Sequence, residues 1–287
     1  MKRMPFLLAL ALVAGCSQAQ ERISDQIYMK NGGAAFTLDV FKVPAANAPC
    51  VIWLCSGGWF SKHEDINPGL AKMFNDQGIA VVEVVHGSQP RYTLNEIVPQ
   101  IRRAVRYVRA NATRFGIDPN RIGISGGSAG GHLSLMMGGT GDAGNPDAKD
   151  PVEQAASMVN AVGVFMPPTD FKNWGRDNYM PFDNPVMGIF MPAFGVTKDT
   201  PKDKMAQVGQ DMSPINFVSA KFPPTMIIHG DKDTLVPIQQ AQVMDAALGK
   251  AGIDHTLVTI EGGGHDAKTF NEGFPKLVAW FKEKLKK

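Results

Sequence analysis

Ser128 is the residue of this sequence best placed to act as a nucleophile. It is the centre of the pattern Gly-Gly-Ser-Ala-Gly at 126–130, which follows an apolar run at 121–124 and precedes a segment with a helical pattern. Glycine is needed on both sides of the serine in so tight a turn, which holds the hydroxyl near backbone amides and the positive end of a helix. This geometry suits attack on a carbonyl carbon, although the five residues alone also describe an ordinary glycine-rich turn.

A serine hydroxyl needs a base within hydrogen-bond reach, and that base needs an orienting acid. In the order Ser, Asp, His, the acid comes next along the chain. The segment 229–237, His-Gly-Asp-Lys-Asp-Thr-Leu-Val-Pro, follows the apolar run Thr225–Ile228 and carries Asp231 and Asp233. Asp231 lies at the strand exit, where it suits bracing the turn through its own backbone, so we favour Asp233 as the acid. Each aspartate alone would be a turn or helix-cap residue.

His265 is the expected base. It follows three glycines after the last predicted strand, in Glu-Gly-Gly-Gly-His-Asp at 261–266, and these glycines leave the backbone free to swing the imidazole over the sheet. His132 is nearer to Ser128 in the chain, but it enters the helix and is expected to point away. The remaining histidines have no comparable setting: His63, His86, His229 and His255.

An oxyanion formed at the carbonyl needs preorganised donors, each worth roughly 3–4 kcal/mol when removed. Ala129 follows the nucleophile and is expected to supply one amide. The loop Ser-Gly-Gly-Trp at 56–59 follows the apolar run Val51–Cys55, and we assign Gly57 and Gly58 as further donors. Trp59 is expected to contact the substrate. The loop alone would pass for an ordinary strand-to-helix turn, and the chemistry needs neither a metal ion nor an organic cofactor.

Strand-like and helix-like segments alternate along the chain. The helical pattern is clearest in Thr93–Ala112 and in the last helix, where apolar residues recur at steps of three and four. Several strand candidates are continuous apolar runs, which is typical of parallel strands covered on both faces. The pattern predicts an α/β fold with a doubly wound, mostly parallel sheet, helices on both faces and an antiparallel edge formed by the first strands. The predicted strands are Phe36–Phe41, Val51–Cys55, Ala80–Val85, Arg121–Ser125, Asn160–Phe165, Thr225–His229 and His255–Ile260.

A long segment at about 166–222 interrupts this alternation. It is rich in proline and aromatic residues and lies between two predicted strands. We interpret it as a cap over the site, the alternative being a satellite hydrophobic cluster under a surface loop. The domain then covers 36–287, preceded by a tether and lead-in at 16–35.

The first residues predict export. A basic start is followed by the apolar run Phe6–Ala14, which is too short to span a bilayer, and then by Val-Ala-Gly-Cys at 13–16. This resembles a bacterial lipobox, so 1–15 is expected to be a lipoprotein signal peptide and Cys16 the lipidated residue. The alternative is an ordinary secretory signal at 1–19, cut after Ala19. The protein is expected at the cell envelope, in the periplasm or outer membrane, or secreted.

Charge and cysteine content narrow the range of partners. Without the leader, which holds two of the 29 basic residues, 27 basic residues face 27 acidic ones. This balance gives no electrostatic case for binding nucleic acid, and the protein would reach the membrane only through the lipid anchor.

Cys50 and Cys55 lie roughly 16 Å apart along one predicted strand, too far for a disulfide, so both are expected to be buried thiols. The oligomeric state is not determined by the sequence.

From about Thr37 to Phe281 the chain resembles the α/β-hydrolase esterases and lipases, in particular the branch with secreted feruloyl and acetyl esterases and hormone-sensitive-lipase-like enzymes. The resemblance rests on 56–59, 104–109, 116–122, 126–132, 229–237 and 264–265. It implies a serine hydrolase of carboxylic esters acting through an acyl-enzyme, on a small-molecule or carbohydrate ester. The branch usually has His-Gly-Gly-Gly-Trp in the oxyanion loop, where this chain has Cys55 and Ser56 in the first two places. The alternatives are a peptidase like prolyl oligopeptidase and a non-catalytic anchored binding lipoprotein.

Overall fold

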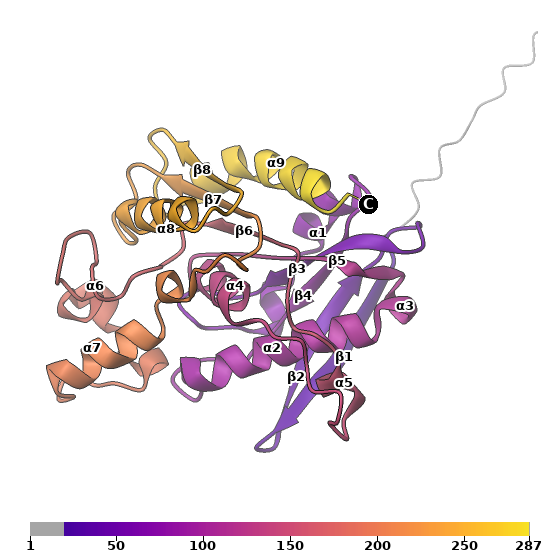
Figure 1. Cartoon of the computed structure of the whole chain (residues 1–287), viewed down its shortest axis with the longest axis horizontal. Coiled ribbons are helices and arrows are strands. Elements are labelled where there is room, and N and C mark those ends of the chain that lie inside the picture. The colour runs from indigo at the N-terminus through magenta and orange to yellow at the C-terminus, as the bar shows by residue number, and fades with distance from the viewer. Residues whose placement is uncertain (1–19, 287) are drawn as a thin grey trace, which may run out of the picture.

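The computed structural model describes residues 20–286 and contains one eight-stranded sheet, in the order β1-β2-β4-β3-β5-β6-β7-β8 (Figure 1). The six strands from β4 to β8 in that order run parallel, and β2 joins them antiparallel to β4. This confirms the predicted α/β fold with a mostly parallel sheet. The strands are β1 (Arg22–Asn31), β2 (Ala34–Phe41), β3 (Ala48–Leu54), β4 (Ala80–Val84), β5 (Ile117–Gly127), β6 (Ala161–Phe165), β7 (Thr225–Gly230) and β8 (His255–Ile260).

Helices cover both faces of the sheet (Figure 1). One face packs against α1 and α9 and the other against α2, α4 and α8, so the buried side chains form two apolar clusters separated by the sheet. Burial on both faces explains why β6 is apolar throughout and why β4 is apolar except at Glu83. The helices are α1 (Pro68–Asn75), α2 (Leu94–Ala110), α3 (Ala112–Phe115), α4 (Ala129–Thr140), α5 (Pro151–Gln154), α6 (Pro185–Gly188), α7 (Lys202–Asp211), α8 (Gln239–Lys250) and α9 (Ala267–Lys284).

Strand β1 corrects the prediction of a tether at 16–35. It pairs antiparallel with β2 along Arg22–Asn31, but register shifts interrupt the pairing at two places. Only Tyr28 of this strand is buried, because β1 is the edge of the sheet and its other side chains reach solvent. An edge strand without an apolar face carries no periodic signal, which is why the sequence pattern missed it.

The segment between β6 and β7 holds short helical turns and α6 and α7, which lie at the left of Figure 1. Phe171 and Phe194 are buried in the same cluster that packs under α2 and α4. Thr169 and Asp170 are anchored to α8. Their backbone amides both donate to the Oε1 atom of Gln240, at 2.8 and 2.7 Å. The segment is therefore tied to the main core and begins at the carboxyl end of β6.

Cys50 and Cys55 are free and buried, as predicted. Burial raises the pKa of both thiols well above the usual range, and Glu83 adds to this effect at Cys55. The leader at 1–15 or 1–19, with Cys16, lies outside the described residues. In the part of the chain that is described, no helix combines the length and apolar character needed to span a bilayer.

Candidate active site

Ser128 occupies a strained turn between β5 and α4. Its backbone angles are φ 53° and ψ −117°, a region that residues with a side chain rarely adopt, and its amide donates to the carbonyl of Phe165 at 2.9 Å. A Cβ atom on Gly126 would lie 2.6 Å from the backbone of Gly130, and one on Gly130 would lie 2.9 Å from the carbonyl oxygen of Leu54. The two flanking glycines are thus required by close backbone approach, as the sequence pattern indicates.

The structure brings Asp233 and His265 together. The Nδ1 atom of His265 lies 2.7 Å from Oδ2 of Asp233, whose side chain is fully buried. The other carboxylate oxygen accepts the amides of Leu235 and Val236, each at 2.9 Å. Burial alone would raise the pKa of Asp233, but hydrogen bonds from His229, His265 and the Val236 amide outweigh it and hold the pKa below the usual range. The carboxylate therefore stays charged and fixes Nδ1 of His265 as a donor, which leaves Nε2 as the basic atom.

The prediction that Asp231 braces its own turn is wrong. Its Oδ1 atom accepts the amide of Gly262 at 2.7 Å, so it links the loop after β7 to the loop after β8. The same two loops touch where a Cβ atom on Gly230 would lie 2.2 Å from the carbonyl oxygen of Gly263. Glycine at position 230 thus allows close packing between the two loops, and this packing carries the imidazole to Asp233.

His229 is a residue of the site that the sequence pattern missed. It is fully buried at the end of β7, with Nε2 2.9 Å from the carbonyl oxygen of Val236 and 3.3 Å from Oδ2 of Asp233. A carbonyl oxygen only accepts, so Nε2 carries the proton and also points it at the carboxylate. Asp233 therefore receives two imidazole donors. The only signal in the sequence is the spacing of four residues between His229 and Asp233, which becomes a contact because the loop turns back.

The loop after β3 forms a closed turn rather than an open strand-to-helix connection. Gly57 and Phe60 exchange both backbone hydrogen bonds, at 3.0 and 2.9 Å. The assignment of Gly57 as an oxyanion donor is corrected by this pairing, because its amide already donates to Phe60. The amides of Gly58 and Ala129 make no hydrogen bond in the described chain, so these two predicted donors remain available.

Trp59 is buried beside the site rather than exposed above it. Only 1% of it is accessible, and its Nε1 atom donates to Nδ1 of His132 at 3.1 Å. The other ring nitrogen of His132 donates to the carbonyl of Met212 at 2.8 Å, so this imidazole is fully occupied. Burial lowers the pKa of His132 to about 4, although the Met212 carbonyl opposes the shift. His132 is therefore a neutral structural residue, in line with its predicted orientation away from Ser128.

Ser128 and His265 line one cavity of about 220 Å³. Its walls are largely apolar, and Pro168, Met187 and Phe190 come from the segment between β6 and β7. That segment therefore covers the site as well as joining the core, which combines the two interpretations of 166–222. The lining residues are Gly57, Gly58, Trp59, Ser128, Ala129, Pro168, Met187, Phe190, Leu235, Val236 and His265.

Comparison with known proteins assigns the chain to a family. The BD-FAE family model matches residues 38–248, which include the oxyanion loop, Ser128 and Asp233. The chain belongs to the BD-FAE family. His265 lies beyond the matched range, so its assignment rests on the geometry described above.

The BD-FAE chain is similar to esterases in sequence and in fold. It is 28% identical to esterase LipQ of Mycobacterium tuberculosis, in a match that covers 86% of this chain and 57% of the relative. It is 31% identical to the probable carboxylic ester hydrolase LipM of the same organism, in a match that covers 73% of this chain and 48% of the relative. The chain thus spans about half the length of these curated relatives. A truncated carbohydrate esterase from gut microbiota superimposes with a TM-score of 0.77 at 25% identity, covering 93% of this chain and 97% of that one. An acetyl ester-xyloside bifunctional hydrolase from Caldicellulosiruptor lactoaceticus gives 0.76 at 23% identity, covering 94% and 98%.

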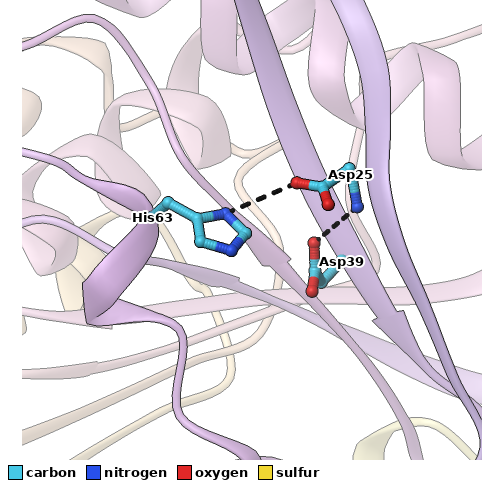
Figure 2. Close-up of side chains that lie close together, drawn as sticks. All are labelled: Asp25, Asp39 and His63. Atoms are coloured by element: carbon cyan, nitrogen blue, oxygen red, sulfur yellow. Dashed lines mark hydrogen bonds and ion pairs between the residues drawn. The ribbon is translucent and has the colours of Figure 1, made fainter.

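A second Asp–His group of this BD-FAE chain joins β1, β2 and the short turn at 63–65 (Figure 2), and none of its residues lines the cavity. Asp25, Asp39 and His63 offer ligand atoms within 4.8 Å of one another. Asp39 is fully buried, but its carboxylate is paired with Arg22 and accepts the amide of Asp25 at 2.9 Å. A metal ion would have to compete with the guanidinium for that carboxylate. We therefore interpret the group as an ion-pair cluster that holds the irregular start of β1 against β2.

Proposed function

We propose that this BD-FAE protein is a serine hydrolase of carboxylic esters. The observation that carries the proposal is the 2.7 Å contact between His265 Nδ1 and the buried Asp233, with His265 and Ser128 on the wall of one apolar cavity. The names of the relatives support the same reaction class, since both are described as esterases or ester hydrolases.

The reaction follows from which atoms are already engaged. Nδ1 of His265 is held by Asp233, so Nε2 accepts the proton of the Ser128 hydroxyl as its oxygen attacks the ester carbonyl. The charge that develops on the carbonyl oxygen is stabilised by the amides of Gly58 and Ala129. His265 then returns the proton to the leaving alcohol, and the acyl group stays on Ser128. A water molecule, deprotonated by the same imidazole, attacks the acyl-enzyme and releases the carboxylic acid.

The walls of the cavity favour an uncharged acyl group. Trp59, Met187, Phe190 and Leu235 offer apolar contact, and His265 is the sole ionisable residue among those that line it. Carbohydrate carrying a small or aromatic acyl group is our preferred substrate class, because solved structures of similar fold include a carbohydrate esterase. An ester panel of rising acyl length, together with acetylated xylan, tests this preference. Hydrolysis restricted to long-chain lipid esters would refute it.

Replacement of the nucleophile tests the reaction itself. Ser128→Ala should lower kcat on short p-nitrophenyl esters by about a million-fold, as loss of the serine does in subtilisin. It should also abolish labelling by a fluorophosphonate probe. The exposed Ser219 provides a matched control, since Ser219→Ala should change neither measurement. Undiminished hydrolysis by Ser128→Ala would remove the assignment.

We also propose that the protein is anchored at the cell envelope through a lipid on Cys16. The support is the lipobox-like sequence and the direction in which the chain enters the sheet. Arg22 pairs with Phe41, and Phe41 pairs with Val81 near the start of β4. The chain therefore enters the sheet at the amino-terminal ends of the parallel strands, opposite the carboxyl ends where Ser128 and His265 lie. An anchor there would leave the site facing away from the membrane. In a bacterial host, radiolabelled palmitate should mark the wild type and not Cys16→Ser, and a mature terminus at residue 20 would contradict the anchor.

A further inference from the structure

The oxyanion turn adopts a conformation that its own residues do not favour. Gly58 has φ +56° and Trp59 has φ +61°, at the centre of the two-residue hairpin closed by Gly57 and Phe60. Positive φ at both central residues defines a type I′ turn, which favours Asn-Gly or Gly-Gly. A glycine followed by a bulky residue suits type II′, where only the first φ is positive. The two types differ by a flip of the peptide between Gly58 and Trp59, and the flip would relieve Trp59 of its left-handed backbone.

Gln89 holds this peptide in the strained orientation. Its side-chain Nε2 donates to the carbonyl oxygen of Gly58 at 2.6 Å, and its backbone amide donates to the carbonyl oxygen of Trp59 at 3.2 Å. Only 3% of Gln89 is exposed, so water competes little for the donor. The indole of Trp59 is held separately by His132. Both carbonyls of the strained pair are therefore tied to one residue in the loop between β4 and α2.

The two residues that replace the family's His-Gly do not perform this task. The hydroxyl of Ser56 is buried and has no hydrogen-bond partner among the described residues. The thiol of Cys55 points to Glu83, with its sulfur 3.7 Å from Oε2. Neither side chain contacts the turn through a polar atom, whereas Gln89 does so from another loop.

We propose that Gln89 is a positioning residue for the oxyanion hole, acting by keeping the Gly58–Trp59 peptide from flipping; this rests on the proposed ester hydrolysis. A trans peptide is planar, so its carbonyl and its N–H point in opposite directions. The Gly58–Trp59 peptide carries the carbonyl of Gly58 and the N–H of Trp59, whereas the Gly58 amide assigned to the oxyanion hole belongs to the preceding peptide. Gln89 does not line the cavity, while Gly58 and Trp59 do, so its hydrogen bond holds the Gly58 carbonyl away from the cavity and leaves the Gly58 amide without an opposing dipole there. A flip would place a carbonyl oxygen beside the developing oxyanion and repel it.

Gln89→Met tests the proposal, because methionine keeps the length of the side chain and removes the N–H donor. We expect kcat on p-nitrophenyl acetate to fall about 10- to 100-fold with KM changed less than threefold, since the loss is confined to the transition state. A boronic acid that mimics the tetrahedral intermediate should bind more weakly by the same factor. Gln100→Met is the matched control: Gln100 is equally buried and holds the Gly87 amide at 2.7 Å in the same loop, without touching the turn.

Gln89→Glu provides an independent measurement. At high pH its carboxylate would face the Gly58 carbonyl and repel it, whereas the protonated carboxyl can donate as the amide does. The ratio of variant to wild-type kcat should therefore rise as pH falls. An unchanged kcat in Gln89→Met, an equal loss in Gln100→Met, or a flat ratio for Gln89→Glu would each overturn the proposal. If Ser128→Ala left hydrolysis intact, the proposed function would fail first and separately.

Discussion

Two groups of this protein contain a buried aspartate with histidine nearby, and their surroundings give them different chemistry. The side chains of Asp233 and Asp39 are both fully buried. Asp233 is contacted by two imidazoles and two backbone amides, with no lysine or arginine among its hydrogen-bond and ion-pair partners in the described chain. Asp39 is paired with Arg22, and among the described residues His63 forms an ion pair with the exposed Asp25, at 3.6 Å, and not with Asp39.

The difference lies in which partner balances the carboxylate. A guanidinium is charged at every working pH, so the Asp39 pair is complete without a histidine. The charge of Asp233 is instead directed at an imidazole whose second nitrogen is free to take a proton. The same residue types thus make an ion-pair cluster near the sheet edge and the proposed proton-transfer site at the strand ends. What decides between them is the arginine on β1 and the cavity beside Ser128.

The largest expected effect comes from making each aspartate neutral. Asp233→Asn should lower kcat by about 10³–10⁴-fold, because the amide no longer holds His265 in the tautomer that leaves Nε2 basic. Asp39→Asn should leave kcat unchanged and lower Tm by about 4 °C, since it leaves Arg22 without its counter-charge. Ester hydrolysis and thermal melting measure the two outcomes. Equal losses of kcat would mean that the two clusters do not differ in the way described.

A smaller effect is expected from the second histidine of each group. His229→Leu should lower kcat about tenfold, because Asp233 loses one donor and orients His265 less firmly. The pH at which half of kcat is lost should shift as well, which a purely structural role would not cause. His63→Leu should change neither value, since the His63 side chain is exposed and Asp25 is its only side-chain hydrogen-bond or ion-pair partner among the described residues. A pH–rate profile of both variants measures these effects. Full activity in His229→Leu would mean that the two backbone amides are enough to orient Asp233 without the His229 imidazole.

The smallest effect concerns Glu83, which lies directly opposite Asp39 across the β2–β4 pair. Burial raises the pKa of Glu83 to about 7, although the Asn67 amide partly opposes the shift. The folded state therefore holds this proton more tightly than the unfolded chain, so Glu83 lowers stability as pH rises from about 4.5 to 7, with little further change above. Glu83→Gln should gain roughly 3–6 °C in Tm relative to wild type between pH 5 and pH 8. A constant Tm difference across that range would contradict the assignment.

The sequence was a good guide wherever one local rule governed the structure. The flanking glycines of Ser128 are dictated by backbone approach within a few residues, and the apolar runs of β3 to β7 by burial on two faces. The same reasoning failed for β1, whose pairing depends on the exposed edge of β2 and not on its own pattern. It also failed for Gly57, because a closed hairpin and an open turn share the same glycine-rich sequence.

For this protein, the linear order of residues determined the fold class and singled out the proposed nucleophile, acid and base, because those depend on periodicity and on motifs read within one segment. Tertiary structure alone decided that His229 joins Asp233, that Gln89 holds the Gly58 peptide, and that the segment between β6 and β7 walls the cavity. These contacts join residues from loops that meet only when parallel strands end at one edge of the sheet. A sequence records which groups exist, whereas their distances are set by how the layers pack.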